Sequence, residues 1–134
     1  MGSIKKNPKI KKECTHCFNP THIIFNFSFI TYMDGFEGIH RENFIKRIIE
    51  ISKEPYLVVA NWPKEIGFEY VEVNISKQID PKFYESENRV FDGKYTIFRL
   101  YPNNNPLKSR IIGKMINKIF YVFFIDINGD LYKH

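Results

Sequence analysis

The feature of this sequence that most constrains the fold is an unbroken apolar run, Ile119 to Ile125 (IFYVFFI), in which every residue is β-branched or aromatic. Such a run, bounded by turn residues, is typical of a strand covered on both faces, although periodicity alone does not separate it from a buried helix. Composition favours the strand, because Ile, Phe, Tyr and Val fit a pleated surface better than a helix. We therefore expect a central strand here.

Two further strands are predicted just before this run. Arg110 to Ile116 (RIIGKMI) is separated from it by Asn117 and Lys118 only, which is short enough for a hairpin. Gly113 inside that segment indicates a bulge or a close approach of two backbones. Tyr95 to Tyr101 (YTIFRLY) follows the tight-turn dipeptide Asp92-Gly93. We expect residues 90 to 125 to form an antiparallel meander.

The first half of the chain predicts one strand and one main helix. In Ile23 to Thr31 (IIFNFSFIT) apolar and polar residues alternate, which is typical of a half-buried strand with Phe25, Phe27 and Phe29 on one face. In Arg41 to Lys53 the apolar residues recur at helical spacing. The predicted core face holds Phe44, Ile48 and Ile51, widened by Ile45, and the charged residues, Arg47 among them, are assigned to a solvated face.

Three less regular segments complete the order of elements. Residues 56–62 fit either a strand or a second short helix, residues 68–75 (FEYVEVNI) read as a strand, and residues 76–89 read as a loop with one turn of helix. This order predicts an α+β fold: an antiparallel sheet of about four to six strands, with one main helix and at most a short second one packed on one face. We expect a flexible basic arm over residues 1–13 and a single domain over residues 14–134.

Charge and hydropathy narrow the class of protein without naming a function. The 134 residues carry a net charge of +5, which permits nucleic-acid binding without requiring it. No segment approaches the roughly 18 uninterrupted apolar residues of a membrane span. The lysine-rich start lacks the apolar core of a secretory signal. We therefore expect a cytoplasmic protein with no membrane partner.

A cysteine–histidine cluster near the start raises the question of a metal site. Cys14, Cys17 and His22 have the spacing C-x2-C-x4-H, which matches three ligands of the zinc-knuckle pattern, but the fourth position falls on Phe27. Because structural Zn²⁺ takes four ligands, another histidine, a carboxylate or a second chain would have to complete the site. Ordinary reduced thiols in a turn are the favoured alternative, and a redox pair is disfavoured because the motif precedes a strand.

Two arginines on neighbouring predicted strands are the best candidates for a functional site. Arg99 and Arg110 each interrupt an apolar pattern, so each must find water, a carboxylate or an anionic ligand. Exposure to solvent, or an ion pair with a residue such as Asp126, accounts for either arginine alone. Two arginines on adjacent strands, with Tyr132 and His134 nearby in sequence, indicate a phosphate-binding face instead.

The end of the chain resembles that of a group of small, mostly uncharacterised bacterial and phage proteins with the pattern FR…RIxG…FYxxxxD…LYxH. The matching segments are Phe98-Arg99, Arg110 to Gly113, Phe120-Tyr121 to Asp126, and Leu131 to His134. That group is in turn distantly similar to the RelE/ParE toxin fold, in which helices pack on an antiparallel sheet of about four strands. The cysteine–histidine cluster is foreign to RelE toxins.

The resemblance implies an activity and a set of site residues. RelE-like toxins cleave mRNA on the ribosome without a metal, through attack of a ribose 2′-OH on its own phosphate. Carried over residue by residue, Arg99 and Arg110 would stabilise charge on the phosphate, and Tyr132 or His134 would manage protons. The partners implied are RNA or the ribosome, and an antitoxin or host protein.

Three functions therefore remain open from the sequence. The first is a RelE-like toxin acting on RNA, a metal-independent endoribonuclease. The second is a non-catalytic phage or plasmid accessory protein that binds a host factor on the same scaffold. The third is a zinc-stabilised nucleic-acid-binding module that uses Cys14, Cys17 and His22. No P-loop, dinucleotide-binding or nucleophile-elbow motif points to another class of enzyme.

Overall fold

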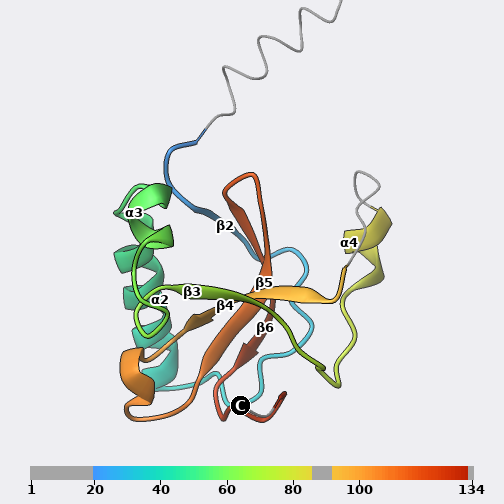
Figure 1. Ribbon diagram of the computed structural model, residues 1–134. Coiled ribbons are helices and arrows are strands. Elements are labelled where there is room, and N and C mark those ends of the chain that lie inside the picture. The colour runs from blue at the N-terminus through green and yellow to red at the C-terminus, as the bar shows by residue number, and fades with distance from the viewer. Residues whose placement is uncertain (1–19, 86–91, 133–134) are drawn as a thin grey trace, which may run out of the picture.

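The last strand, β6 (Ile119–Asp126), lies inside a five-stranded sheet with the order β2-β6-β5-β4-β3. The computed structural model describes residues 20–85 and 92–132. In Figure 1 the strands cross the centre of the molecule, and β6 runs through it in red. From Phe120 to Asp126 every residue of β6 is buried, as expected for a strand covered on both faces. The neighbouring strands are β2 (Ile24–Asn26), β5 (Arg110–Ile116), β4 (Lys94–Arg99) and β3 (Phe68–Glu72).

The hairpin between β5 and β6 has the turn and the bulge that its sequence predicts. Asn117 and Lys118 have φ of 52° and 67°, as a two-residue turn with both central residues in the left-handed region requires. The register shifts between Ile112 and Gly113. A Cβ atom on Gly113 would lie 1.9 Å from the carbonyl oxygen of Tyr121, so only glycine fits this close approach.

Helices cover both faces of the sheet. The main helix α2 (Ile39–Ser52) and the short α3 (Tyr56–Ala60) pack on one face, where Phe44, Ile51 and Val59 join a core with Phe98 and Ile111. The short α4 (Pro81–Glu85) packs on the other face, where Phe83 contacts a second core. Figure 1 shows α2 and α3 side by side, with α4 across the sheet from them. The predicted α+β class with one main helix is confirmed, and α4 is the predicted single turn of helix in residues 76–89.

The first strand differs most from its prediction. β2 pairs with β6 in parallel, whereas the other three pairs of neighbouring strands in the sheet are antiparallel. The sheet is therefore mixed. β2 ends at Asn26, whose Oδ1 accepts the backbone N–H of Ser28 at 2.8 Å and turns the chain. Phe25 and Phe29 consequently join different cores, and Phe27 is 45% exposed. The predicted common face for these three residues is therefore wrong.

The assignment of Arg47 to a solvated helix face is also wrong, because its side chain is buried. Its Nε donates to the carbonyl oxygen of Arg99 at 2.8 Å, and one terminal nitrogen donates to the carbonyl oxygen of Ile66 at 2.7 Å. The other terminal nitrogen pairs with Glu50 at 3.0 Å. Ile45, expected to widen the core face, is 56% exposed. Arg47 thus ties the main helix to the end of β4 and to the chain just before β3.

The remaining boundaries are close to the predicted ones. A 3-10 turn (Pro102–Asn104) follows β4 and leads into β5. Residues 56–62, which fitted a strand or a helix, contain the short helix α3 (Tyr56–Ala60). The predicted arm over residues 1–13 lies outside the described residues. Within the described part of the chain, none of the helices has the length and apolar character needed to cross a bilayer.

Candidate functional site

Arg99 and Arg110 lie directly opposite each other on β4 and β5. Because side chains alternate along a strand, Arg99 shares a face with Ile97, and Arg110 shares a face with Ile112. Ile97 and Ile112 belong to the core beneath α4, so both guanidinium groups lie on the face of the sheet opposite α2. The structure therefore brings the two predicted arginines together at one end of this face.

Asp126 is the cross-strand partner of Arg110, but its carboxylate does not form an ion pair with it. One carboxylate oxygen accepts the N–H of Asp130 and the other accepts the N–H of Leu131, each at 3.0 Å. Among the described residues, no ion pair involves either Arg99 or Arg110. The buried carboxylate instead holds the turn after β6, which places Tyr132 over the sheet.

Arg110 is 2% exposed and is only partly satisfied. One terminal nitrogen donates to Asn104 Oδ1 at 2.8 Å and to the carbonyl oxygen of Ser109 at 3.1 Å. The buried Nε atoms of both Arg99 and Arg110 have no hydrogen-bond partner within the described part of the chain. Buried donors of this kind normally have a partner, so unsatisfied ones at two facing arginines point to a missing acceptor.

Both arginines line one pocket of about 370 Å³. Within the described part of the chain, its charged lining residues are four cations and one carboxylate: Lys64, Arg99, Lys108, Arg110 and Glu69. Val71, Val73, Asn104 and Tyr132 complete the lining. Burial lowers the pKa of Arg110, and the nearby Arg99 lowers it further, whereas Tyr132 and Glu69 act in the opposite direction. Since arginine stays protonated in proteins, the pocket is positively charged and suits an anion.

Tyr132 joins the arginines in this pocket. Burial raises the pKa of its phenol, and the nearby Arg110, which hydrogen-bonds to it, acts in the opposite direction. Because the pKa is shifted upward from 10.0, the hydroxyl keeps its proton at neutral pH. Tyr132 therefore offers a hydrogen-bond donor, and chemically a proton, beside the two guanidinium groups.

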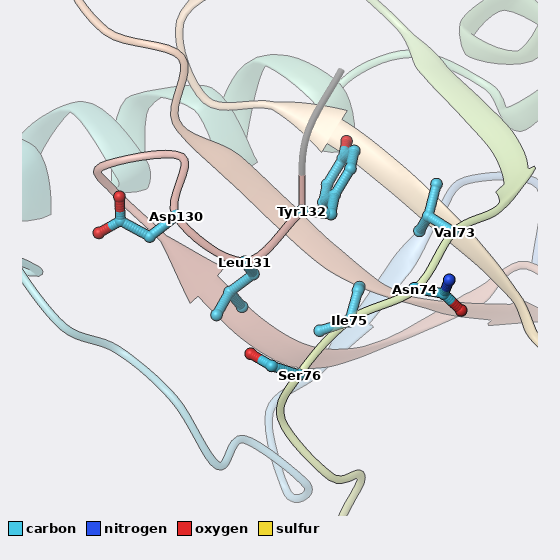
Figure 2. Close-up of a pocket in the computed structure, with 7 residues that line it drawn as sticks. All are labelled: Val73, Asn74, Ile75, Ser76, Asp130, Leu131 and Tyr132. Atoms are coloured by element: carbon cyan, nitrogen blue, oxygen red, sulfur yellow. The ribbon is translucent and has the colours of Figure 1, made fainter.

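A second and larger pocket, of about 650 Å³, adjoins the first and shares Val73 and Tyr132 with it. Figure 2 shows it between the segment after β3, from Val73 to Ser76, and the C-terminal turn from Asp130 to Tyr132. The ring of Tyr132 stands between these two segments, with its hydroxyl pointing away from Ser76. Among residues 20–85 and 92–132, the side chains that line this second pocket include one carboxylate, Asp130, and no lysine or arginine. The two pockets therefore adjoin at Val73 and Tyr132.

Sequence reasoning missed several residues of the site. Glu69 had a usable signal, since it alternates with Val71 and Val73 on a predicted strand and shares their face. Lys64 and Lys108 lie in loops and Asn104 ends the 3-10 turn, and nothing local in the sequence separates them from other surface residues. The fold alone brings them to the arginines.

The other predicted site residues are not assembled by the described structure. His134 and the two cysteines, Cys14 and Cys17, lie outside the described residues. His22 is half-buried, and its Nδ1 lies 2.8 Å from the hydroxyl of Thr21. An oxygen partner on one ring nitrogen suits a histidine that binds metal through the other. Within residues 20–85 and 92–132, no cluster of three or more metal-ligating side chains occurs. The zinc site stays a prediction.

Comparisons with protein-family models, with curated proteins and with solved structures found no match for this chain.

Proposed function

We propose that the protein is a toxin-type endoribonuclease. It binds a phosphodiester of RNA in the cationic pocket and cleaves the bond between phosphorus and the 5′-oxygen of the next nucleotide. One observation carries the proposal: two facing arginines line the same pocket, and each has a buried Nε that lacks an acceptor. Phosphate oxygens satisfy this need, because guanidinium groups bind phosphate through paired, charge-assisted hydrogen bonds. Lys64 and Lys108 add positive charge to the same pocket.

The reaction proposed is attack of a ribose 2′-OH on its own phosphate. The 2′-oxygen forms a bond to phosphorus while the bond to the 5′-oxygen of the next nucleotide breaks. Glu69 accepts the proton of the 2′-OH, and Tyr132 donates a proton to the departing 5′-oxygen. The arginines stabilise the charge that develops on the phosphoryl oxygens. The products are a 2′,3′-cyclic phosphate and a free 5′-OH.

His134 is the other proton donor proposed at the leaving group, as the resemblance to RelE-like toxins implies. An imidazole side chain both accepts and donates protons readily near neutral pH, which suits proton transfer better than a phenol does. Deleting His134 while keeping Tyr132, and the converse Tyr132→Phe, assigns the role. The variant that loses more of its cleavage rate lacks the main donor.

The test uses purified protein with single-stranded RNA and with the same oligonucleotide made of DNA. We expect both to bind, more weakly as salt rises, and only the RNA to be cleaved, since DNA has no 2′-OH. Arg99→Met should lower the cleavage rate by about 10²- to 10³-fold. Arg41→Met removes an exposed arginine of α2 and serves as the matched control.

Two outcomes would contradict the proposal in different ways. Binding without cleavage, also in the presence of ribosomes, would leave a non-catalytic binding protein. No binding of RNA, with Arg99→Met equal to Arg41→Met, would remove the phosphate site altogether. Induced expression followed by RNA profiling extends the test to the cell, where a toxin arrests growth and the Arg99→Met variant does not.

A further inference from the structure

We infer that the outer side of α2 is the interface of an antiparallel dimer of this chain, with Ile45 and Ile49 at its centre. A helix that covers a sheet normally turns its apolar residues to the core and its polar residues to water. Phe44 and Ile51 follow this rule, since both are buried. Ile45 and Ile49 lie one turn apart on the side away from the core, and they are 56% and 47% exposed. Branched aliphatic side chains exposed together in this way mark an interaction surface.

Opposite charges lie at the two ends of this apolar pair. Glu42 precedes Ile45 by three residues and Lys53 follows Ile49 by four, spacings that make neighbours on a helix surface. Lys53 is the C-cap of α2 and keeps helical backbone angles, with φ of −73° and ψ of −21°, so it continues the same line. Both charged residues are exposed. The α2 stripe (Glu42, Ile45, Ile49 and Lys53) therefore runs from acidic through apolar to basic.

This order of charges selects a second copy of the chain in one orientation. In an antiparallel pair with a twofold axis at the middle of α2, Glu42 faces the partner's Lys53, and the symmetry repeats this contact. Ile45 and Ile49 then face the partner's Ile49 and Ile45. A parallel pair would set Glu42 against Glu42 and Lys53 against Lys53, which repel. The helix dipoles also favour the antiparallel orientation. The stripe thus complements itself, as the interface of a twofold dimer must.

The ion pair that Glu42 makes within its own helix leaves its carboxylate accessible to a partner. Its Oε2 lies 3.3 Å from Lys46 Nζ, and the side chains of Glu42 and Lys46 are 60% and 69% exposed. At this exposure water still reaches the carboxylate, and a second cation can take the place of that water. Charged residues around an apolar centre are typical of the rim of a protein interface.

Further apolar residues extend the surface at both ends of the α2 stripe. Ile39 is exposed at the N-terminal end of α2, and Leu57 and Val58 are exposed on α3, just after the C-terminal end. α2 and α3 together form one flank of the molecule (Figure 1). In the antiparallel pair the N-terminal end of one α2 lies beside the C-terminal end of the other, so Ile39 approaches the partner's α3. Because the interface is limited to these two helices, we expect a reversible dimer rather than an obligate one.

The dimer leaves the cationic pocket accessible in both copies. Arg99 and Arg110 lie on the face of the sheet opposite α2, so pairing through α2 does not cover them. The inference is therefore independent of the proposed function, and the presence or absence of RNA cleavage has no bearing on it.

Sedimentation equilibrium of the full chain, from about 1 µM to about 300 µM, tests the dimer. We expect a monomer–dimer equilibrium with a dissociation constant on the order of 10 µM. Ile49→Glu should raise this constant at least about tenfold, because it buries a carboxylate of each copy against the apolar side chains of the other. Tyr84→Glu changes an exposed aromatic residue of α4, across the sheet, and is the matched control that should leave the constant unchanged. Circular dichroism melting verifies that each variant is folded.

An exchange of charges tests the orientation. Glu42→Lys alone, or Lys53→Glu alone, should raise the dissociation constant at least about fivefold, because the symmetry places each repulsion twice in the dimer. The double variant restores opposite charges across the antiparallel pair, and it should return the constant to within about twofold of the parent. In a parallel pair all three variants would oppose like charges, as the parent does, and none would change the constant.

Weaker association of Ile49→Glu, together with recovery in the double charge variant, would support the inference. A monomer at every concentration would overturn it, and the α2 stripe would then serve a different partner. A dimer that Ile49→Glu leaves intact would use another surface of the molecule and would also overturn it. So would a dimer that Ile49→Glu weakens but that the charge variants leave unchanged, because its helices would not be antiparallel.

Discussion

The Nε atom of Arg47 donates a 2.8 Å hydrogen bond to the carbonyl oxygen of Arg99, from the opposite face of the sheet. The helix that covers one face thereby holds the backbone of the residue whose side chain lines the pocket on the other face. The same guanidinium holds the carbonyl oxygen of Ile66, just before β3, which carries Glu69. The buried guanidinium of Arg47 thus connects the main helix to β4, which carries Arg99, and to the chain that leads into β3, which carries Glu69.

Arg47→Met should lower the free energy of unfolding by about 2–4 kcal/mol, because two partly buried carbonyl groups, those of Arg99 and Ile66, would lose their donor. Burial lowers the pKa of Arg47, and the hydrogen bond and attraction of Glu50 oppose this shift. Urea denaturation measures the change. Lys46→Met, one position earlier and exposed, is the control and should stay within about 0.5 kcal/mol of the parent. Equal effects of Arg47→Met and Lys46→Met would show that the hydrogen bonds of Arg47 contribute nothing to the free energy of unfolding.

Asp126→Asn should loosen the C-terminal turn. The carboxylate accepts from the N–H groups of both Asp130 and Leu131, and an amide has only one oxygen to offer. We expect a loss of about 1–3 kcal/mol and faster hydrogen exchange at the Leu131 amide. Asp130→Asn keeps both backbone bonds and should leave that exchange rate unchanged. Unaltered exchange in Asp126→Asn would contradict the assigned role.

Gly113→Ala should severely destabilise the fold. The added Cβ would meet the Tyr121 carbonyl oxygen at 1.9 Å and the Phe120 ring at 3.0 Å, inside a hairpin that cannot part without losing its pairing. We expect a loss of more than about 3 kcal/mol, seen as little soluble folded protein or a much lower melting temperature by circular dichroism. If Gly113→Ala has the same melting temperature as the parent, the backbones of β5 and β6 do not approach each other at Gly113 as closely as the structure shows.

Asp92 should make stability depend on acid pH. A hydrogen bond from Lys114, together with one from the backbone N–H of Lys94, lowers the pKa of Asp92 from 3.8 to about 2. A carboxylate whose pKa falls on folding stabilises the protein above its unfolded pKa, so this contribution is present above about pH 4 and lost towards pH 2.

The carboxylate of Asp92 is half exposed, which limits the contribution to about 1 kcal/mol or less. The measurement is the difference in unfolding free energy between the parent and Asp92→Asn as a function of pH. This difference in unfolding free energy should shrink from pH 5 to pH 2. Parallel curves across this range would exclude the ion pair with Lys114 as a stabilising contact.

How far the sequence predicted the site depends on whether each residue carries a local signal. Arg99 and Arg110 stood out because each interrupts an apolar strand, and neighbouring strands bring such residues together. Arg47 misled, because a charged residue on a helix normally faces water, and only the carbonyl groups it meets in the fold make burial favourable. The Asp126 side chain was equally ambiguous, since an ion pair with Arg110 and capping of the next turn fit the same sequence.

By itself the sequence determined the strands β3 to β6, the hairpin turn at Asn117 and Lys118, the bulge at Gly113 and the main helix, because these depend on side-chain periodicity and on the φ angles that single residues allow. The tertiary structure decided the parallel pairing of β2, the burial of Arg47 and the gathering of Lys64, Glu69 and Lys108 around the arginines. These features join segments far apart in the chain, and their energies arise only when the backbone groups and charges of those segments meet.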